Sequence, residues 1–280
     1  MRKRELEKLL YDFDGETVID QSGSEYSKDG LILLGHRKDL SSYTIKEGTK
    51  VIGNLAFMFC KSLKSVVIPE SVEAIGYSAF SDCEFLQSVT IPKNVKVIGG
   101  GAFSVCQNID VVCKSPRFRI ENKMLISDKG ELVSCWSEDR EIVLPDDVTE
   151  IARDVLSWKD TLRSIAIPEG VTYIGDNAFC YCSSLQSVVL PKKLEEIGWF
   201  AFGNCSSLQS ITIPEGVKII GWSAFTGCDK LQSVIIPESV ECIGDEAFTN
   251  CPCLKSVVVP KSVKKIYDEA FDDTTEIIRK

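Results

Sequence analysis

The apolar positions of this chain return at a fixed interval over most of its length. An isoleucine, in most cases followed by glycine, recurs every 23 residues in two runs, and a proline and a phenylalanine keep the same step. The isoleucines are Ile52, Ile75 and Ile98 in the first run and Ile151, Ile174, Ile197, Ile220, Ile243 and Ile266 in the second. A fixed period of this length predicts a solenoid, in which each unit buries its apolar residues only against its neighbours.

Within one unit the alternation of residues predicts a short strand. In residues 63–85, a stretch rich in β-branched residues turns Val66 and Ile68 inward. Pro69 ends the strand, and Gly76 is expected to let the chain turn tightly. Successive strands are expected to form a parallel sheet with a spacing of about 4.8 Å, because one coil alone buries too little apolar surface to offset its backbone entropy. The complete inward set is Leu63, Val66, Ile68, Val72, Ile75, Ala79, Phe80 and Cys83.

Two segments interrupt the period and are predicted to form hairpins. The residues between Ile98 and Ile151 exceed a whole number of periods, and they contain SDKGE between two apolar runs. The N-terminal region contains SKDG in a similar setting. A short amphipathic helix is predicted before it, from the spacing of Leu6, Leu9, Leu10 and Phe13.

These segments predict one continuous domain. A capping helix and hairpin are expected in 1–44, repeats in 45–271 with a hairpin-bearing insertion at about 114–144, and an acidic end in 272–280. Acidic side chains near that end are expected to form a solvated cap that keeps the last coil from pairing with another chain. They are Asp245, Glu246, Asp268, Glu269, Asp272 and Asp273.

The repeated phrases resemble the bacterial leucine-rich repeats of the BspA type, also called the Treponema pallidum type. The resemblance is close in LKSVVIPESVEAIGYSAFSDC at 63–83 and in LQSITIPEGVKIIGWSAFTGC at 208–228, and it covers most of 45–271. It implies a right-handed leucine-rich repeat solenoid with mostly short parallel β-strands, tight turns and short helical corners. It also implies a binding role, often on bacterial cell surfaces, and no catalytic residues.

Three places depart from the family pattern. Thr274 stands where the last cysteine is expected, and DVLSWK at 154–159 replaces the AFxxC phrase. The stretch VVCKSP at 111–116 is expected to disrupt the third strand.

Composition narrows the classes of partner and the compartment. The 280 residues carry a formal net charge of -9, which argues against nucleic acid or anionic lipid and leaves proteins or glycans as partners. Nothing in the chain predicts insertion into a membrane. No secretory signal is recognised at the start of the chain, and many thiols fit a reducing compartment, so a cytoplasmic location is expected. The alternative is a cell surface or secreted protein with a trimmed N-terminus.

Seven cysteines return at one position of the repeat and are expected to stack as a column. Parallel side chains at strand spacing offer neither disulfide geometry nor four converging zinc ligands, so the prediction is a buried filler whose S–H meets a turn carbonyl. Cys180 and Cys253, each two residues from a column member, are expected to point outward. No metal, cofactor or catalytic site is predicted. The column consists of Cys60, Cys83, Cys106, Cys182, Cys205, Cys228 and Cys251.

The outward positions of the strands form the first candidate for binding. They make columns of small hydroxyl and aliphatic side chains, and an exposed apolar strip often marks a protein contact. An equally weighted alternative is that a tightly coiled sheet prefers small and β-branched residues in any case. The candidate residues are Ser65, Val67, Thr90, Arg163, Val189, Thr212, Ile235 and Val258.

A second candidate is aromatic. Trp199, Phe200 and Trp222 follow the glycine of consecutive units, and Tyr77 takes the matching place earlier. Such rings can hold a sugar face or a protein anchor, although mutual stacking that shields the corner is slightly favoured.

The predicted function is therefore non-catalytic recognition of a protein through the strand face, as in adhesion or interaction proteins. The alternative is a glycan-binding module that uses Trp199 and Trp222. A less favoured alternative is an enzyme that depends on the thiols or on His36, the single histidine, for which the sequence identifies no serine or cysteine partner.

Overall fold

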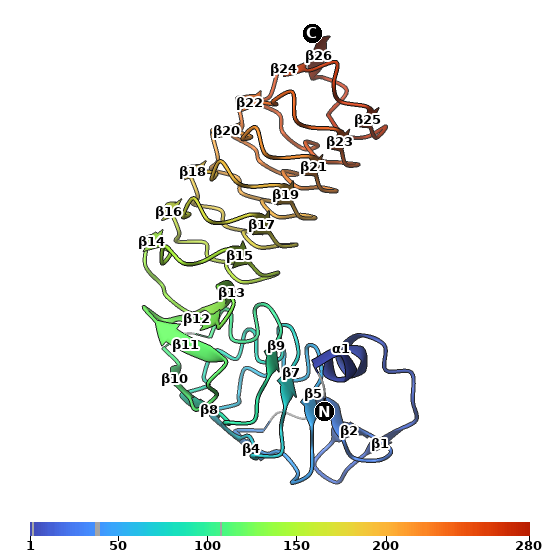
Figure 1. Cartoon of the computed structure of the whole chain (residues 1–280), viewed down its shortest axis with the longest axis vertical. Coiled ribbons are helices and arrows are strands. Elements are labelled where there is room, and N and C mark those ends of the chain that lie inside the picture. The colour runs from blue at the N-terminus through green and yellow to red at the C-terminus, as the bar shows by residue number, and fades with distance from the viewer. Residues whose placement is uncertain (2, 37–39, 107) are drawn as a thin grey trace. The chain divides into compact units, whose positions relative to one another are not determined.

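The structure is a computed structural model that describes residues 1, 3–36, 40–106 and 108–280. By its internal contacts the chain divides into two compact units, Met1–Trp136 and Ser137–Lys280 (Figure 1). Each unit is described by itself. The expected single continuous domain, with its boundaries near 44, 114–144 and 272, stays a prediction.

The first unit contains one helix and two main sheets. One sheet has the strand order β1-β2-β3-β5-β7-β9, the other has the order β10-β8-β6-β4, and β11, β12 and β13 form an antiparallel meander. The elements are α1 (Lys3–Tyr11), β1 (Thr17–Ile19), β2 (Ser24–Ser27), β3 (Ile32–His36), β4 (Ser42–Thr44), β5 (Val51–Ile52), β6 (Ser65–Val67), β7 (Ala74–Ile75), β8 (Ser88–Ile91), β9 (Val97–Ile98), β10 (Asp110–Cys113), β11 (Phe118–Glu121), β12 (Met124–Ser127) and β13 (Glu131–Cys135).

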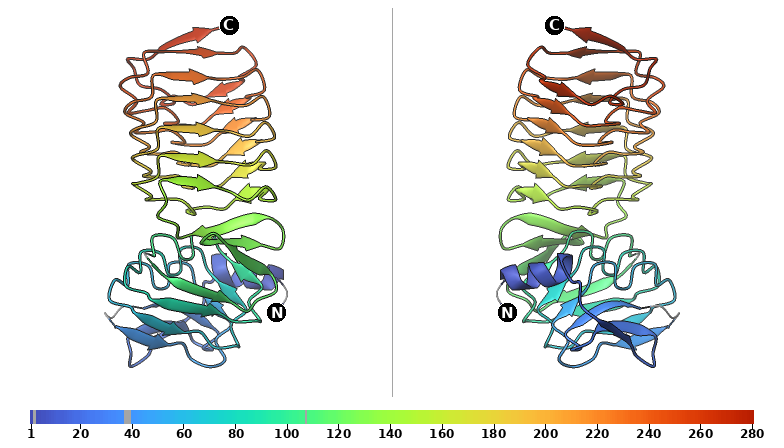
Figure 2. Two further views of the ribbon diagram at one scale, coloured as in Figure 1. Left: turned by 90° about the vertical axis from the view of Figure 1, so that its left-hand side faces the viewer. Right: turned by 90° about the vertical axis from the view of Figure 1, so that its right-hand side faces the viewer.

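The second unit consists of stacked coils, each of which contributes strands to separate parallel sheets (Figure 2). The orders are β15-β17-β19-β21-β23-β25, β14-β16-β18 and β20-β22-β24-β26. The strands are β14 (Glu141–Val143), β15 (Glu150–Ile151), β16 (Ser164–Ala166), β17 (Tyr173–Ile174), β18 (Ser187–Val189), β19 (Glu196–Ile197), β20 (Ser210–Thr212), β21 (Ile219–Ile220), β22 (Ser233–Ile235), β23 (Cys242–Ile243), β24 (Ser256–Val259), β25 (Lys265–Ile266) and β26 (Glu276–Arg279).

The register of the strands confirms the predicted solenoid. Ser164 pairs with Ser187 and Ile174 pairs with Ile197, so equivalent residues of neighbouring coils lie side by side. Two sets of parallel strands result, and we name them by position. The front strands are β4, β6, β8 and β10 in the first unit and the even-numbered strands from β14 to β26 in the second. The flank strands are β5, β7 and β9 in the first unit and the odd-numbered strands from β15 to β25 in the second.

The core of each unit is a ladder of phenylalanine rings. Neighbouring rings are 4.9 to 5.5 Å apart between centroids, and their planes lie within 6° of parallel. A fixed repeat places identical side chains above one another, so the offset stacking that aromatic rings favour continues from coil to coil. The ladders are Phe57, Phe80 and Phe103 in the first unit and Phe179, Phe202, Phe225, Phe248 and Phe271 in the second.

The repeated glycine acts through space rather than through its backbone angles. Gly76 does not have a positive φ, but a Cβ added there would lie 2.4 Å from the backbone nitrogen of Asn54 on the preceding coil. The predicted tight turn is therefore wrong for Gly76, which is required because two coils approach closely. The corners are tight turns in which non-glycine residues, such as Phe200 and Asn204, adopt φ of 54° and 57°.

The two predicted hairpins are confirmed, and each belongs to a three-stranded meander. The SKDG turn joins β2 to β3, and the SDKGE turn joins β12 to β13. The additional antiparallel strands β1 and β11 were not predicted. Between β11 and β12, Asn122 and Lys123 both have positive φ, as a two-residue type I′ hairpin requires. The expected disruption at 111–116 is wrong, because β10 pairs with β8 from Asp110 to Cys113 without a break.

The predicted N-terminal helix is also confirmed and covers the flank strands of the first unit (Figure 1). Leu6 and Leu10 of α1 are buried in one cluster with Val51 and Ala74. Among the described residues, no helix is both long enough and apolar enough to cross a membrane.

Candidate functional site

The front strands present the predicted outward columns. In β18 the middle residue Val188 is buried while Val189 is 77% exposed, and the same alternation exposes 61% of Ile235 in β22 and 57% of Val67 in β6. The remaining predicted residues, Ser65, Thr90, Arg163, Thr212 and Val258, are exposed on or directly before these strands. The first unit thus carries three of the candidates and the second unit five, and their role in binding stays a prediction.

Three further aliphatic side chains extend these columns and were missed. Val112 pairs with Thr90, Val143 with Ala166, and Ile278 with Val258. Val112 lies 22 residues after its partner and Ile278 lies 20 residues after its partner, so a search at a fixed step of 23 passes over both. Val143 keeps the step but follows the hairpin insertion.

The front strands of the first unit also border a hollow of about 260 Å³. Val67 and Thr90 lie on its floor side, and Glu70, Pro92 and Lys114 complete the lining. Because charged, polar and aliphatic groups meet there, the hollow can accept an amphipathic side chain.

The predicted aromatic patch is divided by the structure. The rings of Trp199 and Trp222 meet edge-on, with centroids 6.4 Å apart and planes at 79°, so the expected parallel stacking is wrong. Phe200 instead contacts Tyr181 edge-on at 6.2 Å. Tyr77 belongs to the first unit, where it stacks on Tyr11 of α1 at 6.3 Å.

A second aromatic pair was missed by sequence reasoning. The rings of Trp158 and Tyr181 stack with centroids 3.9 Å apart and planes at 13°. Both residues have left-handed backbone angles, with φ of 61° and 59°, which turn their side chains out of the coil. The signal was present, because the two residues lie one period apart directly before the column position.

Trp199 and Trp222 line a groove of about 380 Å³ on the second unit, which we call the flank groove. Ile219 and Cys242 of the flank strands form its floor, and Tyr267 lies at the C-terminal side. Its full lining is Trp199, Ile219, Ile220, Gly221, Trp222, Cys242, Gly244, Asp245 and Tyr267.

The cysteine column has the predicted structural role. In six of its members the thiol donates to the carbonyl oxygen of the residue 26 positions earlier, with S···O distances of 2.9 to 3.4 Å. Burial raises the pKa of Cys182 to about 12, so its thiolate is not formed at neutral pH. All 12 cysteines lie in the described part of the chain and are free thiols.

The two cysteines expected to point outward differ. Cys253 is exposed, but Cys180 is only 5% exposed, so that expectation is wrong for Cys180. Its position belongs to a second inward column of small residues, where Ser81, Ser104 and Ser157 are also buried. Burial raises the pKa of Cys180 as well.

The departure at 154–159 places a lysine in the cysteine column. Lys159 is buried and its ammonium group donates to the carbonyl oxygen of Ser137 at 2.6 Å. A backbone carbonyl thus accepts from Lys159 as carbonyls accept from the thiols, which explains why the substitution is tolerated.

His36 has a serine partner that sequence reasoning did not identify. Its Nδ1 lies 2.8 Å from the hydroxyl of Ser24, and its ring lies against Tyr43 and Phe57 at 5.0 and 5.8 Å between centroids. Ser24 has no exposed surface, so its hydroxyl cannot reach a substrate. Among the described residues, no three His, Cys, Asp or Glu side chains converge as a metal site would require.

Comparison with known proteins identifies the repeat type. The family profile of the BspA type leucine rich repeat region matches residues 36–159 and 149–278, in six copies. No curated protein is significantly similar to this chain in sequence.

Several crystal structures of bacterial proteins are similar to this chain. A leucine rich cell surface protein from Faecalibacterium prausnitzii is 32% identical, with a TM-score of 0.69 over 78% of this chain. This chain spans 59% of the length of that protein. The pneumococcal vaccine antigen PcpA is 24% identical, with a TM-score of 0.71 over 86% of this chain and 68% of its own. A leucine-rich repeat protein from Eubacterium ventriosum is 22% identical, with a TM-score of 0.58 over 94% of this chain and 96% of its own. The last two likenesses concern the fold alone.

Proposed function

We propose that this chain, which belongs to the BspA-type leucine-rich repeat proteins, is a non-catalytic module that binds a protein through the outward face of its front strands. The observation that carries the proposal is the column of exposed aliphatic side chains, among them Val67, Val189 and Ile235. A protein that covered these side chains would gain about 1.5 to 3 kcal/mol for each one fully buried.

The rigidity of the face supports the same proposal. Each front strand is held by parallel pairing on successive coils, and the alternation keeps the middle residue, such as Val188, in the core. Side chains such as Val189 and Thr212 are therefore held at a fixed spacing before a partner arrives. Little conformational entropy remains to be lost on binding, which favours affinity.

We also propose that the protein is displayed at the cell surface. The F. prausnitzii protein, which is 32% identical, is described as a cell surface protein. The cytoplasmic expectation rested on the many thiols, but Cys182, Cys205 and Cys228 are buried and have raised pKa values. Such thiols are protected by their position, so they do not require a reducing compartment.

The experiment compares two variants that add the same charge. In the face variant, Val67, Val189 and Ile235 are changed to Glu. In the control variant, Leu55, Phe59 and Trp158, which are exposed apolar residues of the corners, are changed to Glu. Extracellular matrix proteins, mucins and lysate of the producing cell are passed over each immobilised protein.

A protein ligand that binds the wild type and the control variant, but not the face variant, would support the proposal. Equal binding to the face variant would refute it. The cellular source of the ligand, together with surface labelling of intact cells, tests the location.

The glycan-binding alternative rests on the flank groove, since Trp199 and Trp222 are more than half-exposed or half-exposed there. Alanine at both positions should abolish binding of an oligosaccharide under that alternative and leave binding by the front strands unchanged. The thiol-dependent enzyme has less support, because burial raises the pKa values of the column thiols and Ser24 is inaccessible beside His36.

A further inference from the structure

We infer that the flank groove of the second unit is a docking site for a short, basic, amphipathic helix of a partner protein. The groove lies on the flank strands and not on the front strands, so the inference does not depend on the proposed function. Its floor is formed by Ile219 and Cys242, and its aromatic wall by Trp199 and Trp222.

The first unit shows how a helix fits this surface. Its flank strands present Val51, Ala74 and Val97, which are aligned by the parallel register. Leu6 and Leu10 of α1 are packed on these side chains and are 0% and 7% exposed. A helix is therefore the element that covers flank strands when their outward positions are apolar.

The floor of the flank groove occupies the same repeat positions. Val51 and Ala74 each precede the isoleucine of the Ile-Gly phrase, as do Ile219 and Cys242. The register places Ile219 beside Cys242 just as it places Val51 beside Ala74. Ile219 is 43% exposed, so this floor is open where the equivalent surface of the first unit is covered.

The aromatic wall has a counterpart in the first unit as well. Tyr77 takes the repeat position of Trp199 and Trp222, and it stacks on Tyr11 at the end of α1. The neighbouring side chain Asn54 donates from Nδ2 to the carbonyl oxygen of Leu10 at 2.8 Å. The corner after the flank strands thus receives the last turn of a docked helix, and an aromatic residue in that turn would meet Trp222.

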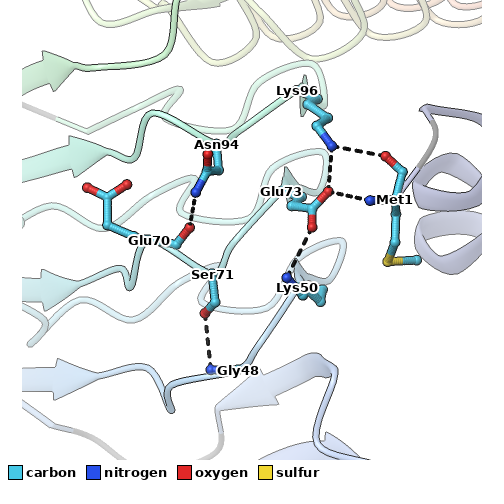
Figure 3. A network of polar contacts seen from close by, with 8 residues as sticks. All are labelled: Met1, Gly48, Lys50, Glu70, Ser71, Glu73, Asn94 and Lys96. Atoms are coloured by element: carbon cyan, nitrogen blue, oxygen red, sulfur yellow. Dashed lines mark hydrogen bonds and ion pairs between the residues drawn. The ribbon is translucent and has the colours of Figure 1, made fainter.

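Charge distinguishes the two surfaces and defines the partner. In the first unit, Glu73 accepts from Lys50, Lys96 and the amino group of Met1 (Figure 3). Although burial opposes ionisation, these donors lower the pKa of Glu73 to about 2. The polar groups beside α1 are therefore already matched.

The borders of the flank groove carry an excess of carboxylates instead. Asp245 lines the groove, Glu196 pairs in register with Ile219, and Asp268 follows Tyr267. The nearby cation Lys265 lies over the ring of Tyr267, with its nitrogen 3.8 Å from the ring centroid. A partner helix with lysine or arginine on its polar face would complement this border.

The lining favours a helix over a sugar. The edge-on pair of Trp199 and Trp222 does not present two parallel ring faces, and the floor offers the aliphatic Ile219 and the thiol of Cys242. Among the lining side chains only Asp245 is charged. Sugar hydroxyls need several polar partners, whereas leucine side chains of a helix need apolar contact.

The test uses the full chain and a labelled synthetic peptide. The peptide has the sequence of residues 3–13 with Glu5→Lys, Glu7→Lys and Asp12→Lys, which keeps the apolar face of α1 and makes its polar face basic. Binding is measured by fluorescence anisotropy at low salt. We expect a Kd on the order of 10 to 100 μM. Ile219→Ser and Trp222→Ala should each weaken binding about tenfold, and Trp158→Ala should leave it unchanged.

The variants leave the net charge unchanged, so they separate docking from attraction to an acidic surface. Equal affinity of the wild type, Ile219→Ser and Trp222→Ala would overturn the inference. So would equal binding of a second peptide with Leu6→Ser and Leu10→Ser, or no binding at about 1 mM peptide.

Binding of a mucin oligosaccharide that is lost in Trp199→Ala, without peptide binding, would overturn the inference in favour of a glycan. Thermal unfolding of each variant confirms that the groove residues have not disturbed the fold. Failure of the front-strand experiment would leave this test unaffected, because the substituted residues do not overlap.

Discussion

The flank strands of the two units are built by the same repeat but differ in what covers them. In the first unit Val51, Ala74 and Val97 lie under α1, whereas in the second unit the same positions include Ile219 and Cys242 and remain open. The coil geometry of a solenoid therefore does not determine how its sides are used. The element outside the repeat decides whether a flank is core or surface.

The largest expected effects should be equal in the two units, because both share the phenylalanine ladder. Phe80→Ala and Phe202→Ala each remove a fully buried ring stacked between two others. Each should lower the free energy of unfolding of its unit by about 3 to 5 kcal/mol. Denaturant unfolding, followed by hydrogen exchange in each unit, measures this. A much smaller loss in one unit would show that the two cores are not equivalent.

The next effect should appear only in the first unit. Leu6→Ala removes a fully buried side chain of α1 and should cost about 2 to 4 kcal/mol. Hydrogen exchange should rise in α1, β5 and β7, while residues 137–280 stay as protected as in the wild type. If exchange in the first unit does not change, α1 does not stabilise the flank strands.

A smaller effect should depend on pH. The pKa of Glu73 is about 2 in the folded protein, below its ordinary value of 4.5, because Lys96, the Met1 amino group and Lys50 outweigh the effect of burial. The carboxylate therefore stabilises the first unit fully above about pH 4.5, and this contribution is lost as the pH falls toward 2. Glu73→Gln should cost about 1 to 2 kcal/mol at pH 7, since its partners are partly exposed.

The measurement for Glu73 is chemical unfolding of the wild type and the Gln variant at several pH values. Their difference in unfolding free energy should be constant from pH 7 to about 5 and should shrink at lower pH. A difference that does not change between pH 6 and 3 would contradict the assignment.

The smallest effect is expected in the flank groove. Ile219→Ser removes a side chain that is partly exposed and should change stability by less than about 0.5 kcal/mol. Thermal unfolding provides the measurement, with Leu6→Ala as the comparison. A loss as large as that of Leu6→Ala would show that Ile219 is part of the core and not of an open groove.

Much of the fold could be predicted because the repeat is short and its alternation is local. Val66 is buried and Val67 exposed as the strand pattern requires, and the SKDG and SDKGE turns form the predicted hairpins. The break expected near Cys113 is absent, since a strand tolerates the loss of one residue from the period when its partner strand is intact.

Less of the candidate site could be predicted. The outward columns followed from alternation, but the edge-on contact of Trp199 with Trp222 depends on side-chain rotation, which no period specifies. The stack of Trp158 on Tyr181 depends on left-handed backbone angles at both residues. The burial of Cys180 depends on a second inward column, which the strand pattern does not reveal.

The sequence by itself determined the period, the inward and outward sides of the front strands, the cysteine column and the type of repeat. Each of these depends on residues that are close in the chain or one period apart, so local sterics and apolar burial suffice. The tertiary structure alone decided that α1 covers Val51 and Ala74 and that the surface around Ile219 stays open. That difference depends on where a segment outside the repeat comes to lie, and no regularity within the repeat contains this information.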